Sequence, residues 1–293
     1  NQTLDILLDK NKVVEISATI KNENYEVIDA SQWFISKGFS DLLCDFCDPG
    51  YEHKETLESG MKAAENAGYT SVTLSPLTQP KVDNKANLKY IINQQTNSLE
   101  LLCAATISQN ANGKDLSEML DLSEQGAELF YDGQNECDSK LLKKALLYSQ
   151  KTGKRIAIHP NLNSFSEASQ IHESVIGTTL GLKGSPSFSE YSAIDQALDV
   201  LRYTGGKLHF HLISCAESVN KIAVAKKEGL DITCSVSFFH LIQNESIQEE
   251  FDANYKVWPP LRSEKDRQAL VKGINNQIID YISAAHTPID SEG

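Results

Sequence analysis

The sequence contains no long uninterrupted apolar run, and no stretch approaches the ~20 residues that a membrane-spanning helix needs. Its start, Asn-Gln-Thr-Leu-Asp, has no basic segment followed by an apolar one, so no signal peptide is expected. Because the first residue is Asn and not Met, we expect the natural chain to begin further upstream. These absences argue against a membrane association.

A basic surface is missing as well. The net charge is −13, and no cluster rich in Lys or Arg interrupts the acidic balance. Nucleic-acid binding requires a basic footprint that neutralises phosphates, so a nucleic-acid partner is not expected. With 40% hydrophobic and 23% charged residues over 293 positions, the chain has the composition of a soluble globular protein with a substantial core.

Cysteine is scarce, since six cysteines in a chain of this length do not make a disulfide scaffold. Cys103, Cys215 and Cys234 lie in or beside apolar runs, where a free thiol behaves as a small apolar group. This usage favours a reducing compartment, hence a cytoplasmic protein. Cys44 and Cys47 form a C-x-x-C pair at a predicted strand end, but no second pair completes a zinc ribbon, so we interpret the spacing as coincidental.

What the sequence does contain is a regular series of short apolar or β-branched runs. They are nearly continuous hydrophobic segments, which is typical of parallel strands that are buried on both faces. There are eight such runs, at residues 41–46, 71–75, 99–107, 127–131, 155–159, 207–214, 231–237 and 279–284.

Segments with helical spacing lie between these runs, and most of them end at a glycine, which is a C-cap signal. They cover residues 52–67, 115–125, 139–152, 189–204, 216–228 and 263–275. Ser263 is the expected N-cap of the last one, with Asp266 three residues on. Eight strand–helix units without a G-x-G-x-x-G motif favour a (β/α)8 barrel of the TIM type over an open doubly wound sheet.

The first 38 residues differ from the rest, because residues 4–8, 13–16 and 25–29 look like short antiparallel strands. We therefore divide the chain into a small, partial β-subdomain, residues 1–38, and a barrel, residues 39–293. No helix follows the eighth predicted strand, so we expect the elements that would close the barrel at its C-terminal end to lie outside this sequence.

Active sites in such barrels lie at the C-terminal ends of the strands. Polar residues gather at those positions. They are Asp45, Asp48, Thr78, Asp132, His159, Ser214, His240 and His286.

Five segments that include or adjoin these positions carry a family resemblance. Residues 47–55 read CDPGYEHKE, residues 75–80 SPLTQP, residues 126–133 GAELFYDG, residues 257–264 VWPPLRSE and residues 284–289 AAHTPI. They resemble, in the same order, the R-E-P-G-x-E-H-K-E, M-P-N-T-x-P, G-A-x-x-F-S-D-D-G, V-N-P-P-L-R-S-E and T-D-H-A-P-H segments of dihydroorotases, a class I-like branch of the amidohydrolase superfamily. The similarity runs from about residue 38 to the end, and residues 1–37 resemble part of that family's N-terminal β-subdomain.

The resemblance implies an enzyme that hydrolyses a cyclic amide, interconverting dihydroorotate and carbamoyl-aspartate in pyrimidine synthesis. It also implies one or two zinc ions, which polarise the ring carbonyl and generate hydroxide. The family's ligands are two histidines on strand one, a Lys or Asp on strand four, a His on each of strands five and six, and an Asp on strand eight that also transfers the proton.

Carried over residue by residue, this ligand set is mostly lost. The strand-one histidines become Leu43 and Asp45, the strand-six histidine becomes Leu212, and the strand-eight aspartate becomes Ala285. The resemblance therefore gives no catalytic residue, and it leaves as vestigial metal candidates Asp45, Asp132 and His159. We expect no cofactor, or at most one weakly bound zinc.

The substrate-pocket positions implied by the resemblance have changed too. Cys47 replaces an Arg, Leu77 replaces an Asn, and Trp258 replaces an Asn and is expected to fill the pocket. His240 and His286 sit at positions near the pocket and could equally be structural. His209 and His211 are expected to pack between the strand and helix layers, because alternate strand residues face opposite sides and Leu212 is assigned to the interior.

Two functions are consistent with these residues. The first is a catalytically impaired or inactive dihydroorotase homologue, a pseudoenzyme that acts as a structural partner of aspartate transcarbamoylase. The second is an active dihydroorotase or cyclic amidohydrolase with a reduced one-metal site. The resemblance further implies a homodimer, and similarity to metal-free dihydropyrimidinase-like signalling proteins is a weaker third interpretation.

Overall fold

The computed structural model describes residues 3–10, 12–21, 25–96, 98–134 and 136–290. The chain divides into two compact units, Asn1–Lys37 and Gly38–Gly293. In the first unit, β1 (Asp5–Asp9) pairs antiparallel with β2 (Lys12–Ser17). The strand predicted at residues 25–29 is wrong: these residues form no strand, and Val27 and Ile28 are 85% and 69% exposed, with no neighbouring ladder to pair with among the described residues.

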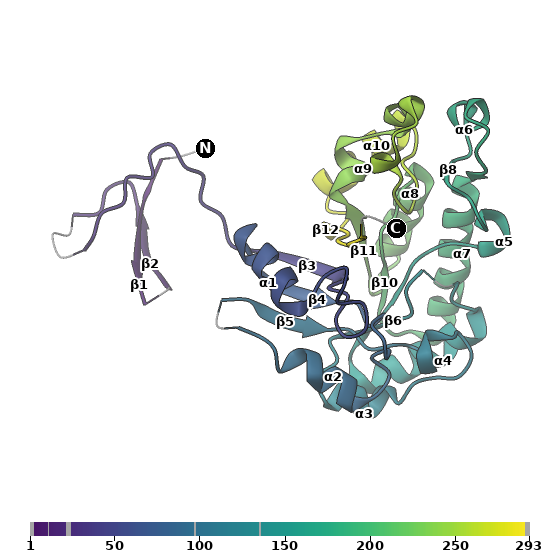
Figure 1. The fold of residues 1–293 in the computed structure, drawn as a ribbon, viewed down its shortest axis with the longest axis horizontal. Coiled ribbons are helices and arrows are strands. Elements are labelled where there is room, and N and C mark those ends of the chain that lie inside the picture. The colour runs from purple at the N-terminus through teal and green to yellow at the C-terminus, as the bar shows by residue number, and fades with distance from the viewer. Residues whose placement is uncertain (1–2, 11, 22–24, 97, 135, 291–293) are drawn as a thin grey trace. The chain divides into compact units, whose positions relative to one another are not determined.

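In the described part of the second unit, eight parallel strands build the barrel, one at each of the predicted runs (Figure 1). They are β3 (Phe39–Cys44), β4 (Tyr69–Leu74), β5 (Glu100–Cys103), β6 (Leu129–Tyr131), β7 (Arg155–Ile158), β10 (Leu208–Phe210), β11 (Ile232–Ser237) and β12 (Tyr281–Ser283). One ladder runs β3-β4-β5 and the other runs β6-β7-β10-β11-β12.

Two contacts join these ladders into a ring. A parallel bridge between Ala105 and Phe130 connects the end of β5 to β6. At the other seam, the buried carboxylate of Asp41 on β3 accepts hydrogen bonds from the Ser283 hydroxyl, at 2.7 Å, and from the backbone N–H of Ala284. The strand order is that of a (β/α)8 barrel, which confirms the predicted fold class.

The helices that connect successive barrel strands lie outside the strands (Figure 1). They are α1 (Leu57–Asn66), α2 (Lys85–Ile92), α3 (Met119–Glu124), α4 (Ser139–Thr152), α7 (Ser187–Thr204), α8 (Ala216–Lys227) and α10 (Glu264–Asn275). The hydroxyl of Ser263 accepts from the backbone N–H of Asp266, as predicted for the N-cap of α10. Helix α1 begins five residues later than the predicted 52, because Thr56 is its N-cap and forms a capping box with Ser59 in the first turn.

Shorter elements fill the loops at the C-terminal ends of the strands. The loop after β5 holds η1 (Gln109–Ala111), and the loop after β7 holds α5 (Asn163–Ser166), β8 (Ile171–His172), α6 (Val175–Thr179) and β9 (Gly184–Ser185). The loop after β11 holds α9 (Phe238–Ile242), η2 (Glu245–Glu250) and η3 (Ala253–Tyr255).

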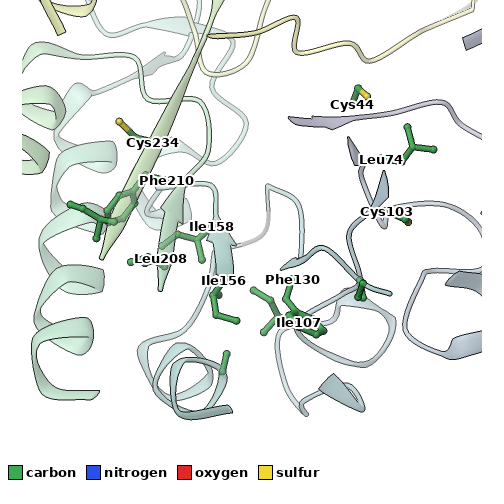
Figure 2. Close-up of a cluster of buried hydrophobic side chains, with 14 of the residues drawn as sticks. Cys44, Leu74, Cys103, Ile107, Phe130, Ile156, Ile158, Leu208, Phe210 and Cys234 are labelled. Carbon is green, nitrogen blue, oxygen red and sulfur yellow. The ribbon is translucent and has the colours of Figure 1, made fainter. Parts of the chain in front are cut away.

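The hydrophobic core has two layers, as strand alternation requires. The larger cluster lies between strands and helices, and Figure 2 shows Ile156 and Ile158 of β7 with Leu208 and Phe210 of β10 in it. A smaller cluster contains Leu43, Ala104, Leu129, Tyr131 and Ala157, and it fills the inside of the barrel. In the described part of the chain, no helix has the length and apolar character that crossing a membrane requires.

Candidate functional site

A cavity of about 430 Å³ opens at the C-terminal ends of the strands, where barrel active sites lie. Six strands end at it and contribute side chains within or just beyond their last residues. These side chains are Leu43 and Asp45 from β3, Ser75 and Leu77 from β4, Tyr131 and Asp132 from β6, His159 from β7, His211 and Leu212 from β10, and Ala285 and Thr287 from β12. The cavity therefore brings together all three predicted metal candidates.

Three hydrocarbon side chains of the cavity share an unusual backbone conformation. Leu43, Leu212 and Ala285 have φ angles of 62°, 57° and 51°, in the left-handed region that costs an L-residue roughly 1–2 kcal/mol. All three occupy positions that the sequence resemblance gives to metal ligands. Non-glycine residues in this conformation cluster at functional sites, so the backbone here keeps a site-like geometry although its side chains are hydrocarbon.

Asp132 is buried, and its carboxylate is bound to the loop after β5. It accepts from the backbone N–H of Ile107 at 2.7 Å and of Ser108 at 3.1 Å, and also from the Ser108 hydroxyl. Burial raises the pKa of Asp132, and these hydrogen bonds oppose the rise. The carboxylate thus fixes the loop that leads into η1.

His159 is fully buried, and burial lowers its pKa to about 4, so its ring is neutral at pH 7. Its Nδ1 lies 3.2 Å from the backbone carbonyl oxygen of His211. A carbonyl can only accept, so Nδ1 carries the proton and Nε2 is the ring's acceptor. Trp258 lies beside it, with the two ring centroids 6.4 Å apart.

The prediction that His209 and His211 pack between the strand and helix layers is wrong, because both side chains lie inside the barrel. Leu208 and Phe210 belong to the outer cluster, so His209 between them faces inward. His209 pairs in register with Ala157, which is part of the inner cluster. His211 has the same parity and lines the cavity, where its ring packs edge-on against Tyr131.

The backbone of Leu212 explains why strand alternation misplaces His211. Alternation holds only while the backbone is extended, and the left-handed φ of Leu212 breaks it, so His211 and Leu212 both reach the cavity. His211 is hydrogen-bonded through Nδ1 to the Ser235 hydroxyl, at 3.1 Å. Burial lowers the pKa of His211 well below its usual value, so this ring is neutral as well.

Asp45 and Lys81 are two further ionisable side chains that line the cavity. Asp45 accepts from the Thr287 hydroxyl at 3.2 Å, and burial raises the pKa of Asp45. Lys81 donates to the backbone carbonyl of Leu77 at 3.0 Å, and burial lowers the pKa of Lys81. Sequence reasoning missed Lys81, although its place just after the SPLTQP segment was a signal that it could reach this part of the site.

The predicted substrate-pocket residues separate into two groups. Leu77 and Trp258 line the cavity, whereas Cys47, His240 and His286 are outside its lining. Leu77 packs so close to Gly133 that a Cβ built there would lie 2.5 Å from its Cδ1. Leu77 and Trp258 therefore form a bulkier cavity wall than the two Asn residues that the resemblance implies at these positions.

His240 and His286 have structural partners. His240 is buried with Nε2 3.0 Å from the carbonyl oxygen of Pro259, and burial lowers the pKa of His240 to about 4. His286 is half-exposed, and its Nε2 lies 2.7 Å from a carboxylate oxygen of Glu55. Both therefore brace loops around the cavity.

The donor set does not fit the zinc ions that the resemblance implies. Structural and catalytic zinc needs three or four N, O or S ligands at about 2 Å. Within the described residues, no three His, Cys, Asp or Glu side chains come together in a way that could hold a metal ion. Asp45, Asp132 and His159 share the cavity but do not converge, since Asp132 is turned to the Ser108 loop.

Comparisons with known proteins agree with the five segments that carry the resemblance. A family model described as dihydro-orotase-like matches residues 34–218. A dihydroorotase of Carboxydothermus hydrogenoformans is 36% identical over 288 residues, covering 97% of this chain and 67% of the relative. A dihydroorotase of Bacillus licheniformis is 34% identical over 293 residues, covering 98% of this chain and 68% of the relative.

The chain belongs to the dihydroorotase family. Solved structures support the fold: an L-hydantoinase (dihydropyrimidinase) from Arthrobacter aurescens matches with a TM-score of 0.83 at 21% identity, over 99% of this chain and 66% of that chain. This dihydroorotase-family chain thus spans about two thirds of the length of the proteins it matches. Its family membership, its amidohydrolase-type barrel and its link to pyrimidine metabolism are as the sequence predicted.

Proposed function

We propose that this chain is a non-catalytic member of the dihydroorotase family that acts as a structural partner of aspartate transcarbamoylase in pyrimidine synthesis. The observation that carries the proposal is the presence of Leu43, Leu212 and Ala285 in the cavity, at positions where the family resemblance requires metal ligands. Hydrocarbon side chains offer no lone pair to a metal ion. The Asp that would transfer the proton is among the lost positions.

The rest of the cavity supports the same proposal. Asp132 accepts three hydrogen bonds from one loop, so its oxygens already have partners. Cys47 and Leu77 stand where the resemblance implies an Arg and an Asn that bind substrate. Loss of metal ligands and substrate contacts together indicates loss of the reaction and not exchange of one metal for another.

A second candidate is an active cyclic amidohydrolase with a one-metal site. It is favoured by three nitrogen or oxygen side chains that line one cavity, Asp45, His159 and His211, which would have to move together to hold a metal. Two of these are histidines with neutral rings, which is the form that ligates zinc. The relatives' printed name, dihydroorotase, is consistent with this candidate.

Elemental analysis and an activity assay separate the two candidates. Untagged protein purified without chelator is expected to contain well under one zinc per chain and to leave dihydroorotate unopened. One zinc per chain, removed by a chelator together with ring-opening activity, would establish the second candidate instead. The 36%-identical dihydroorotase is the matched control for both measurements.

The partner is tested by co-expression with aspartate transcarbamoylase from the same organism. We expect the two chains to co-elute on size exclusion at a fixed stoichiometry, and we expect the chain alone to elute as a homodimer. Separate elution of the two proteins at micromolar concentration would contradict the scaffold role.

A further inference from the structure

Three side chains outside the barrel cavity are hydrogen-bonded in series in the loops above the strands. His172 of β8 places its Nδ1 2.9 Å from a carboxylate oxygen of Glu245, the first residue of η2. The Nε2 of the same ring lies 3.4 Å from the hydroxyl oxygen of Ser187, the first residue of α7. A serine, a histidine and a carboxylate from three separate segments thus form one chain of contacts.

The chemistry of the groups fixes the proton positions. A carboxylate can only accept, so Nδ1 of His172 donates to Glu245. In the neutral form of the ring, Nε2 is then the acceptor, and it faces the Ser187 hydroxyl. This is the order of roles in a serine nucleophile with its base and orienting acid, and such contacts are often looser before substrate binds.

Rigid elements hold the serine and the histidine. Helix α7 has 18 residues, and Ser187 opens it. Strand β8 pairs with β9, where His172 is in register with Ser185, two residues before the serine. The carbonyl of Ser185 accepts from the buried guanidinium of Arg262 at 2.6 Å, which fixes this strand to the loop before α10.

The start of α7 also supplies hydrogen-bond donors. The first N–H groups of an α-helix have no partner within the helix, and the positive end of the helix dipole favours a developing negative charge there. Pro186 is the N-cap; its carbonyl oxygen accepts from Ser189 N–H at 3.1 Å, and its side chain offers no acceptor to the N–H groups of Ser187 and Phe188. An oxyanion formed at Ser187 would therefore lie beside these donors.

The site reaches solvent and borders an aromatic surface. The side chains of His172 and Glu245 are 13% and 15% exposed. Phe188, next to the serine, is 43% exposed and packs edge-on against Phe165, with the ring centroids 5.1 Å apart. Phe165 is itself 49% exposed. An apolar or aryl group of a substrate would pack on these rings.

We propose that Ser187, His172 and Glu245 form a serine-esterase site for small esters with an apolar acyl or aryl group. The Ser187 oxygen attacks the ester carbonyl carbon while its proton passes to His172 Nε2. The alcohol leaves with that proton, and an acyl-serine remains. Water then attacks through the same base, releases the carboxylic acid and returns the proton to Ser187. Glu245 is a positioning residue. The proposal is independent of the family reaction.

The test is active-site labelling of the full-length chain with a fluorophosphonate probe, followed by intact mass and peptide mapping. We expect one adduct per chain, on Ser187, and hydrolysis of p-nitrophenyl butyrate. Ser187→Ala abolishes both. Ser164→Ala, an exposed serine beside the same aromatic pair, leaves both unchanged.

The other two residues are separated by kinetics. His172→Gln is expected to lower kcat about 10²–10⁴-fold, the usual contribution of a general base. Glu245→Gln lowers kcat with KM retained, and Glu245→Asp recovers part of the loss, which a merely structural contact would not do. Wild-type protein that gains no adduct, or an adduct that persists in Ser187→Ala, overturns the proposal whatever the variants' folding.

Discussion

At the scale of single residues, the cavity combines a left-handed backbone with hydrocarbon side chains at three positions. Leu43, Leu212 and Ala285 keep left-handed φ angles that leucine and alanine do not favour. Such strain persists where the surrounding structure over-determines it. Here the neighbouring strands do so: the backbone N–H of Asp45 donates to the carbonyl of His286, and the Ser235 hydroxyl accepts from Leu212 N–H.

Replacing Ala285 by glycine tests this strain. Ala285→Gly is expected to raise the free energy of unfolding by about 0.5–1 kcal/mol, because relief of roughly 1–2 kcal/mol of left-handed strain exceeds the roughly 0.4–1 kcal/mol of added unfolded-state entropy. The control is Ala284→Gly at the preceding residue, whose φ is not left-handed. This substitution should destabilise the fold by about 0.5–1 kcal/mol. Urea denaturation measures both changes in the free energy of unfolding. If both variants were destabilised, or both stabilised, Ala285 would not be strained.

At the scale of elements, helix ends are set by side chains that satisfy free N–H groups. Ser263→Ala is expected to lower the free energy of unfolding by about 1 kcal/mol, because the hydroxyl that accepts from Asp266 N–H at the start of α10 is removed. Ser123→Ala, in the last turn of α3 and not at an N-cap, should change it by less than about 0.5 kcal/mol. Chemical denaturation that gives the same loss for both serines would show that the cap is unimportant.

The elements also show how far sequence reasoning reaches. All eight barrel strands and helix α4 fell where the pattern placed them, because long apolar runs and a glycine C-cap are strong local signals. Helix α2 and the two-residue strands β8 and β9 were missed. Two residues carry no period, so only tertiary contacts reveal such strands. Strand β8 contains His172, and β9 ends two residues before the first residue of α7.

The candidate site was predictable in location but not in detail. The pattern of strands and helices predicts that Asp45, Asp132 and His159 lie together at the C-terminal end of the barrel, and all three line the cavity. The orientation of His211 was wrong because one left-handed residue ended the strand alternation. The Ser108 loop that occupies Asp132 is also beyond sequence reasoning, since its partner is 24 residues away.

At the scale of the whole molecule, buried neutral histidines set a pH dependence. Burial lowers the pKa of His159 and His240 to about 4 and that of His209 to about 3, and that of His211 falls well below the usual value. As pH falls below 6.5, the unfolded chain binds protons that the folded chain does not, so stability is lost between pH 6.5 and about 4. Each such group contributes about 1.4 kcal/mol per pH unit.

Urea denaturation at pH 7, 6 and 5 measures this slope, which should be positive and amount to several kcal/mol over the range. Replacing the fully buried His209 by Gln should reduce the slope by about one proton, and the same substitution at the exposed His53 is the control. Burial raises the pKa of Asp41, Asp45 and Asp132, so these carboxyls act with the opposite sign at the acid end. A slope of zero would contradict the neutral state of the buried rings.

The left-handed backbone at three strand ends bears on how easily a metal site could be introduced here. A strained main-chain conformation persists only where many neighbours determine it together, whereas a side chain changes with one substitution. In this chain the left-handed main-chain conformation is present at Leu43, Leu212 and Ala285, and all three residues line the cavity. If the proposed non-catalytic function holds, a metal site would require only new side chains on this main chain, and we expect point mutations at these positions to be enough to introduce metal ligands.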